Sequence, residues 1–245
     1  MKALLLDIES APLTVFCWGL REQDISLDQI IDTSYVLCWS AKWLGQDEMM
    51  FERTWKKKRS SRVMIQRIHG LISEADAVIT YNGIKFDLPV LNREFLLHGL
   101  PPPPPHVQID LIKPARSRFR FASNKLDHLA GELGLGSKAP HDGFMTWIRA
   151  MEMDAQAWDV MTAYNKHDVV ILERLYYRLL PWLKTHPNLS RGEIRCPNCA
   201  SDKTQRRGKA RSRTAAHQRY QCRSCGSWFR SVASDKHERQ QVVAL

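Results

Sequence analysis

Two C-x-x-C pairs near the C-terminus constrain the fold of this chain more than any other feature. The first pair is Cys196 and Cys199, and the second is Cys222 and Cys225, with 22 residues between the pairs. The apolar run after Met1 is too short for a signal peptide, so this spacing indicates a metal site more than disulfides. Four thiolates suit one tetrahedral Zn²⁺. A segment this small lacks an adequate hydrophobic core, so a structural zinc ion is expected to stabilise it.

Positive charge is concentrated in the same segment. Residues 191–245 hold 13 Lys and Arg against 4 Asp and Glu, whereas residues 1–190 hold 23 against 22. The last 55 residues therefore carry +9 of the net charge of +10. This density indicates a polyanionic partner, most simply nucleic acid, with a protein partner left open as the alternative.

The sequence also bears on location. No run of about 18 apolar residues follows the N-terminus, so a membrane-spanning helix and a membrane partner are not expected. We expect a cytoplasmic, globular protein.

Strand and helix patterns alternate over residues 1–183. Apolar or β-branched runs predict strands at Lys2–Ile8, Thr14–Leu20 and Tyr35–Leu44, arranged as an opening β-meander, and further strands at Ala77–Tyr81 and Val107–Leu111. Helical spacing or boundary signals predict helices at Arg62–Glu74, from Asp87 to about His98, at Asn124–Leu135 and at Ala155–Leu183. The pattern predicts an α/β domain.

Acidic residues occur at three places in this pattern. Asp7 and Glu9 lie two apart at the end of the first strand, so both side chains project from one face. Asp87 follows an Asn-Gly turn between a strand and a helix, and Tyr164 and Asp168 lie four apart on one helical face. Neighbouring carboxylates repel one another unless a cation lies between them, and hard oxygen ligands suit Mg²⁺ or Mn²⁺.

The three motifs carry a specific resemblance. D-I-E, N-G-x-x-F-D and Y-x-x-x-D, in this order, resemble the exonuclease motifs of the DEDDy branch of the RNase H-like 3′→5′ exonucleases, including the proofreading domains of family B DNA polymerases. The segment Ser123–Ala130 resembles the helix before the third motif. The resemblance covers roughly residues 1–183. It implies an αβα sandwich around a mixed five-stranded sheet.

The resemblance also implies residue roles. Asp7, Glu9 and Asp168 would hold one Mg²⁺ or Mn²⁺, and Asp7, with Asp87 through water, would hold a second. Tyr164 would orient or deprotonate the attacking water. His167 faces about 100° away from Asp168 on the helix and is interpreted as structural or as a phosphate contact.

Nucleic-acid contacts are expected at both ends of the chain. The resemblance implies that Asn82, Phe86 and Lys125 contact the substrate, with turn formation for Asn82 and core packing for Phe86 as alternatives. The cysteine segment resembles the zinc ribbons of some transposases. Basic residues between its cysteine pairs, together with two aromatic residues, are expected to contact phosphates and bases: Arg206, Arg207, Lys209, Arg211, Arg213, Tyr220 and Trp228.

These observations predict an exonuclease domain at 1–183, a linker at 184–194, a Cys₄ zinc ribbon at 195–230 and a polar tail at 231–245. The leading hypothesis is a 3′→5′ exonuclease that acts on DNA ends by a two-metal-ion mechanism, with a replication or repair protein as a further expected partner. An exoribonuclease and a non-catalytic nucleic-acid-binding module are the alternatives. The complete set of carboxylates argues against the non-catalytic alternative.

Overall fold

The computed structural model describes residues 1–136, 143–184, 186–190, 194–212 and 215–234. The chain divides into two compact units, Met1–Leu175 and Tyr176–Leu245. The division falls inside the long helix α6 (Ala155–Leu179).

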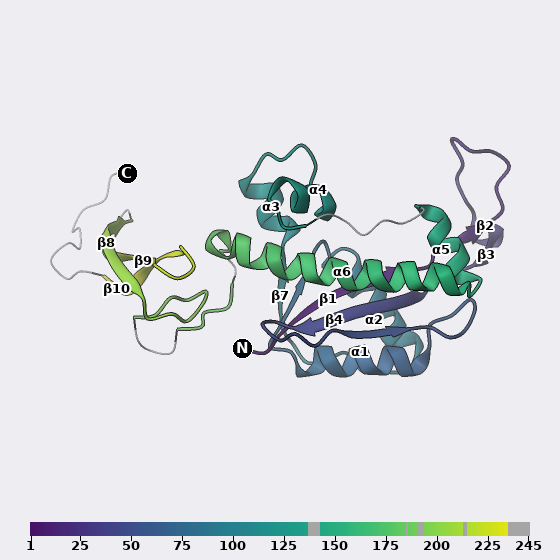
Figure 1. The fold of residues 1–245 in the computed structure, drawn as a ribbon, viewed down its shortest axis with the longest axis horizontal. Coiled ribbons are helices and arrows are strands. Elements are labelled where there is room, and N and C mark those ends of the chain that lie inside the picture. Colours follow the sequence, from purple (N-terminus) through teal and green to yellow (C-terminus); the bar gives the residue numbers. More distant parts are fainter. Residues whose placement is uncertain (137–142, 185, 191–193, 213–214, 235–245) are drawn as a thin grey trace. The chain divides into compact units, whose positions relative to one another are not determined.

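A mixed five-stranded sheet forms the centre of the first unit (Figure 1). Its strand order is β5–β4–β1–β6–β7, and its strands are β1 (Ala3–Ser10), β4 (Val36–Trp43), β5 (Met50–Arg53), β6 (Ala77–Thr80) and β7 (Val107–Asp110). β1 pairs antiparallel with β4 and parallel with β6, and β6 pairs parallel with β7. The predicted fold class is confirmed.

Helices cover both faces of the sheet (Figure 1). α1 (Arg62–Glu74) and α2 (Asp87–Leu97) share one core cluster with β1, β4 and β6. On the opposite face, α5 (Phe144–Met151) and α6 form a second cluster with residues of the β4 segment such as Leu37 and Cys38. β4 thus contributes to both cores, with Val36, Trp39 and Ala41 in the first and the adjacent Leu37 and Cys38 in the second, where the register between β1 and β4 shifts.

The start of the chain differs from the prediction. Thr14–Leu20 was expected to be the second strand of the sheet, and this was wrong: only β2 (Thr14–Val15) is extended, and it pairs with β3 (Ile30–Asp32) in a separate two-stranded sheet. β4 occupies the edge of β1 instead. Without a sheet partner or a core beneath them, Trp18 and Leu20 are 97% and 100% exposed.

Other helices and strands differ in extent. β5, α3 (Ile112–Arg118) and α5 were not predicted, and α4 (Leu126–Glu132) is shorter than the predicted Asn124–Leu135. α6 ends at Leu179, and the short 3₁₀ helix η2 (Leu180–Trp182) continues the chain. Another 3₁₀ turn, η1 (Leu27–Gln29), precedes β3. None of the described helices is both long enough and apolar enough to cross a membrane.

The second unit contains a three-stranded antiparallel sheet. β9 (Ala216–Cys222) lies between β8 (Thr204–Arg211) and β10 (Trp228–Ser234). β10 continues four residues past the predicted ribbon end at residue 230, and the rest of the predicted polar tail lies outside the described residues. Tyr220 and Phe229 stack with their ring centroids 5.3 Å apart, so they supply the small apolar core of this sheet.

Candidate active site and metal centres

The alternation of side chains along β1 decides where its two carboxylates point. Leu4, Leu6 and Ile8 pack in the core beneath α1 and α2. The intervening residues, Asp7 and Glu9, therefore face the opposite side of the sheet, which α6 covers. Apolar residues on one face thus fix the orientation of the acidic ones.

Two other helices complete the acidic group. α6 carries Tyr164, which is 7% exposed, and Asp168 one helical turn later. Asp87 is the first residue of α2, and its Oδ1 accepts a hydrogen bond from the Ile8 N–H at 3.1 Å. This bond links the start of α2 directly to the D-I-E strand.

The turn before α2 depends on two special residues and one carboxylate. Asn82 has a φ of 67°, in the left-handed region that Asn tolerates better than most residues. A Cβ on Gly83 would clash with the side chain of Thr80, so only glycine fits there. The carboxylate of Asp110 accepts hydrogen bonds from the Asn82 N–H at 2.7 Å and the Ile84 N–H at 3.2 Å. Asp110 lies outside the three acidic motifs, and its carboxylate holds the turn that presents Asp87.

All five predicted catalytic residues line one cavity of about 530 Å³. Three predicted substrate contacts, Asn82, Phe86 and Lys125, line it as well, and Phe86 is 44% exposed. The full lining is Asp7, Ile8, Glu9, Tyr81, Asn82, Phe86, Asp87, Ile112, Arg116, Asn124, Lys125, Leu126, Asp127, Tyr164 and Asp168. His167 is not among these residues.

The cavity disfavours negative charge on its carboxylates. Burial raises the pKa of Asp7 well above its ordinary value, and three neighbouring carboxylates raise it further. Burial likewise raises the pKa of Asp87 to about 7, although the hydrogen bond from the Ile8 N–H acts to lower it. The pKa of the Tyr164 hydroxyl is also raised, first by burial and then by Asp168 and the β1 carboxylates. A cation in this cavity would relieve the repulsion.

Two hydrogen-bond donors hold the β1 carboxylates. The Asn165 side-chain amide donates to Asp7 Oδ2 at 2.6 Å, and the indole N–H of Trp147 donates to Glu9 Oε2 at 3.1 Å. The Trp147 ring also meets the Tyr164 ring edge to face, with centroids 5.9 Å apart. Neither donor was predicted from the sequence. The position of Asn165 directly after Tyr164 was the available signal, whereas nothing local marked Trp147.

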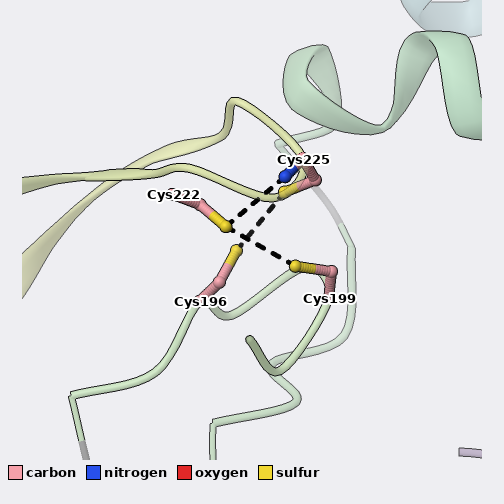
Figure 2. Close-up of side chains that lie close together, drawn as sticks. All are labelled: Cys196, Cys199, Cys222 and Cys225. Carbon is pink, nitrogen blue, oxygen red and sulfur yellow. Dashed lines mark hydrogen bonds between the residues drawn. The ribbon is translucent and has the colours of Figure 1, made fainter. Parts of the chain in front are cut away.

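The four cysteines of the second unit converge on one point (Figure 2). Their sulfur atoms all lie within 4.8 Å of one another, and none is in a disulfide. The Cys225 N–H donates to Cys222 Sγ at 3.5 Å, as expected of a knuckle that supports thiolates. The Asn198 amide donates to Leu180 O at 2.9 Å and to Ser227 Oγ at 3.1 Å, joining the two knuckles. The donor set fits one tetrahedral Zn²⁺.

The basic residues of the ribbon have different environments. Arg206, Arg207 and Arg211 are exposed on β8, Lys209 is half-buried, and Arg213 lies outside the described residues. Trp228 is 52% exposed, with the Arg219 guanidinium over its ring at 5.2 Å. Tyr220 is only 6% exposed, and its ring is stacked on Phe229. Its expected role in base stacking therefore conflicts with its place in the ribbon core.

Comparisons with known proteins agree with this architecture. A family model described as the RNase_H superfamily matches residues 31–180, and one described as the InsA N-terminal domain, a zinc ribbon, matches residues 192–226. The first match begins after Asp7 and Glu9. A comparison with curated proteins found no match.

This chain is also similar to a solved structure. It is the family B DNA polymerase from the hyperthermophilic archaeon Pyrobaculum calidifontis, with a TM-score of 0.56 and 16% sequence identity. The match covers 74% of this chain and 24% of the polymerase chain, so the chain spans about a quarter of the polymerase's length. At this identity the likeness concerns the fold.

Proposed function

Because this chain belongs to the RNase H superfamily, we propose that it is a metal-dependent 3′→5′ exonuclease that hydrolyses phosphodiester bonds at DNA ends. The observation that carries the proposal is the cavity in which four carboxylates and a tyrosine from β1, α2 and α6 converge. Structural carboxylates are usually paired with cations, whereas burial and the three neighbouring carboxylates raise the pKa of Asp7.

The donor set fits divalent cations. Asp7, Glu9 and Asp168 would hold one Mg²⁺ or Mn²⁺, and Asp7 and Asp87 would hold a second, because hard carboxylate oxygens are the ligands these ions prefer. Bound there, the ions would lower the pKa of a bound water to supply hydroxide at neutral pH and would stabilise charge on the departing 3′ oxygen.

The chain's own residues would orient the reactants. Burial is the largest cause of the raised pKa of Tyr164, so its hydroxyl keeps its proton at neutral pH. We infer that Tyr164 orients the attacking water by a hydrogen bond and does not deprotonate it. Phe86, exposed at the start of α2, offers a ring surface for the terminal base.

The ribbon would add affinity for nucleic acid. Arg206, Arg207 and Arg211 present charge to solvent on one strand, and Trp228 exposes an aromatic ring two strands away. This combination suits phosphate contact with base stacking.

Digestion of end-labelled substrates tests the proposal. With Mg²⁺ or Mn²⁺, a 5′-labelled DNA strand should shorten stepwise, a 3′-labelled strand should release labelled mononucleotide first, and circular single-stranded DNA should stay intact. Matched RNA and mismatched duplexes in parallel would reveal an exoribonuclease or a duplex preference.

Two variants identify the site. Asp7→Ala should abolish cleavage, because Asp7 would be shared by both ions. Asp159→Ala removes an exposed carboxylate from α6 outside the cavity and should keep the parental rate. Parental activity in Asp7→Ala, or cleavage of circular DNA, would refute the proposed function.

A further inference from the structure

A second basic region lies within the nuclease unit. Of the 23 Lys and Arg in residues 1–190, five fall between positions 113 and 125, where there is no Asp or Glu. The remaining residues of that span hold 18 Lys and Arg against 22 Asp and Glu. The five cations are Lys113, Arg116, Arg118, Arg120 and Lys125. Residues 1–190 are nearly neutral in total, and their positive charge is concentrated at 113–125.

The structure places this basic segment at the acidic cavity. The segment begins in α3, directly after Asp110 at the end of β7. Arg116 and Lys125 line the same cavity as the four carboxylates. They are its only Lys or Arg among the described lining residues. The basic segment thus borders the candidate active site through Arg116 and Lys125.

The five cations have no acidic partners among the described ion pairs. All five are exposed, and no salt bridge within the described residues includes any of them. Lys57 and Lys58, in another basic run of the same unit, do have acidic partners. Lys57 pairs with Glu152 and Lys58 with Asp32. Self-pairing therefore does not account for the charge at 113–125.

Local contacts hold the segment against the cavity. The Tyr81 hydroxyl donates to the Asn124 carbonyl at 2.7 Å, joining the end of the segment to the chain just after β6. The Phe119 and Phe121 rings contact each other with centroids 5.6 Å apart. Burial raises the pKa of Tyr81 to about 12, while the Arg116 guanidinium acts against this rise, which places Arg116 near Tyr81. The cations are presented by an anchored stretch of chain.

We propose that residues 113–125 bind the phosphate backbone of the nucleic-acid strand whose end lies at the carboxylates. This inference rests on the proposed function. Four carboxylates repel an approaching polyanion, and the cations of residues 113–125, of which Arg116 and Lys125 line the cavity, offset that repulsion. Each phosphate neutralised by Lys or Arg also releases condensed counterions, which favours binding at low salt. The nuclease unit then holds its substrate independently of the basic ribbon.

Binding measured as a function of salt tests the inference. The full-length, zinc-loaded protein is titrated into a fluorescein-labelled single-stranded 15-nucleotide DNA without chelator and without added Mg²⁺ or Mn²⁺, so that cleavage is not expected, at several KCl concentrations. The variant R116Q/R118Q/R120Q should bind more weakly. The slope of log K against log[KCl] should decrease in magnitude by about 2, since each phosphate contact on a single strand contributes about 0.7. Circular dichroism checks that the variant is folded.

A charge-matched control separates a specific surface from net charge. K56Q/R59Q/R62Q removes three exposed cations of the same unit from a segment of which no residue lines the cavity, so its slope should stay at the parental value. Equal slopes for the parent and R116Q/R118Q/R120Q would overturn the inference. An equal decrease of the slope in the two triple variants would overturn it as well.

Cleavage assays keep the two proposals distinguishable. In Mg²⁺, R116Q/R118Q/R120Q should raise KM for the 15-nucleotide strand, with little change in kcat. Suppose that the parent protein cleaves no substrate, while R116Q/R118Q/R120Q loses salt-dependent binding and K56Q/R59Q/R62Q does not. The exonuclease proposal then fails, and the proposal that residues 113–125 bind phosphates stands. If the parent cleaves DNA and R116Q/R118Q/R120Q has the parental slope of log K against log[KCl], the proposal that residues 113–125 bind phosphates is wrong and the exonuclease proposal stands.

Discussion

Three carboxylates of the acidic cavity each have one oxygen fixed by a neutral donor. Asn165 holds Asp7, Trp147 holds Glu9, and the Ile8 N–H holds Asp87. A donor on a carboxylate oxygen fixes the orientation in which that carboxylate faces the cavity. Such outer contacts typically change metal affinity by about 10–100-fold when removed.

Removing these donors should weaken metal binding without removing a ligand. We expect Asn165→Ala and Trp147→Phe each to lower Mn²⁺ affinity by about tenfold or more. Titration of free Mn²⁺ by electron paramagnetic resonance, without nucleic acid, measures this. Trp55→Phe, at a tryptophan that is 68% exposed, is the control and should bind Mn²⁺ like the parent. Unchanged affinity in both test variants would mean that the donors only pack the protein.

The tyrosine and histidine of the third motif should differ in effect. Tyr164→Phe keeps the ring against Trp147 and removes only the hydroxyl, so folding should survive. The cleavage rate should fall by about 10²–10⁴-fold, or less if the metal alone activates the water. His167→Ala should reduce the rate far less, because His167 does not line the cavity. A large loss for His167→Ala with little for Tyr164→Phe would reverse this assignment.

Metal binding should depend on pH in a defined direction. The raised pKa values of Asp7 and Asp87 mean that the folded, metal-free protein binds protons more tightly than the unfolded chain. This contribution to stability is present below about pH 4, the ordinary pKa of Asp, and is lost as pH rises towards the folded pKa of about 7 for Asp87. Metal ions compete with these protons. The increase in Tm caused by Mg²⁺ should therefore grow between pH 5 and pH 8, and a constant increase would contradict the assignment.

At the scale of elements, the turn between β6 and α2 sets the position of Asp87. Gly83→Ala would place a methyl group against the buried Thr80 side chain. We expect a loss of about 1–3 kcal/mol in the free energy of unfolding and a fall in activity as Asp87 is displaced. Gly70→Ala, in the interior of α1 with no atom near the new methyl, should instead stabilise the protein by about 0.5–1 kcal/mol. Urea denaturation of the two variants tests this contrast, and equal effects would disprove the packing argument.

At the scale of the whole molecule, the two units should be separable in function. The purified protein should contain about one zinc ion per chain, and Cys222→Ser should lose it together with the fold of the ribbon.

Removing residues 191–245 takes away 13 Lys and Arg and 4 Asp and Glu, so nucleic-acid binding and its salt dependence should weaken. The shortened chain should still cleave short substrates. Metal analysis and salt titration measure these outcomes, and a zinc-free parent protein would contradict the first.

The sequence by itself determined the features that depend on local pattern. Helical spacing placed α1 at Arg62–Glu74 with correct ends, and β-branched runs located β1, β4, β6 and β7 within a few residues. The spacing of Cys196, Cys199, Cys222 and Cys225 anticipated the cluster of four sulfurs. The order of the three acidic motifs anticipated their shared cavity. Each of these features depends on residue type at fixed short separations, which a single sequence displays.

Only the tertiary structure decided which separate segments meet. Thr14–Leu20 has strand-like composition, but β4 takes the edge of β1 that it would have needed. Trp147 reaches Glu9 across 138 positions, and Asp110 supports a turn 26–28 positions earlier, so no local pattern marks either role. Tyr220 and Trp228 look alike in sequence, yet the ribbon core buries one and leaves the other exposed. Burial and long-range hydrogen bonds arise from packing, which exists only once the chain has folded.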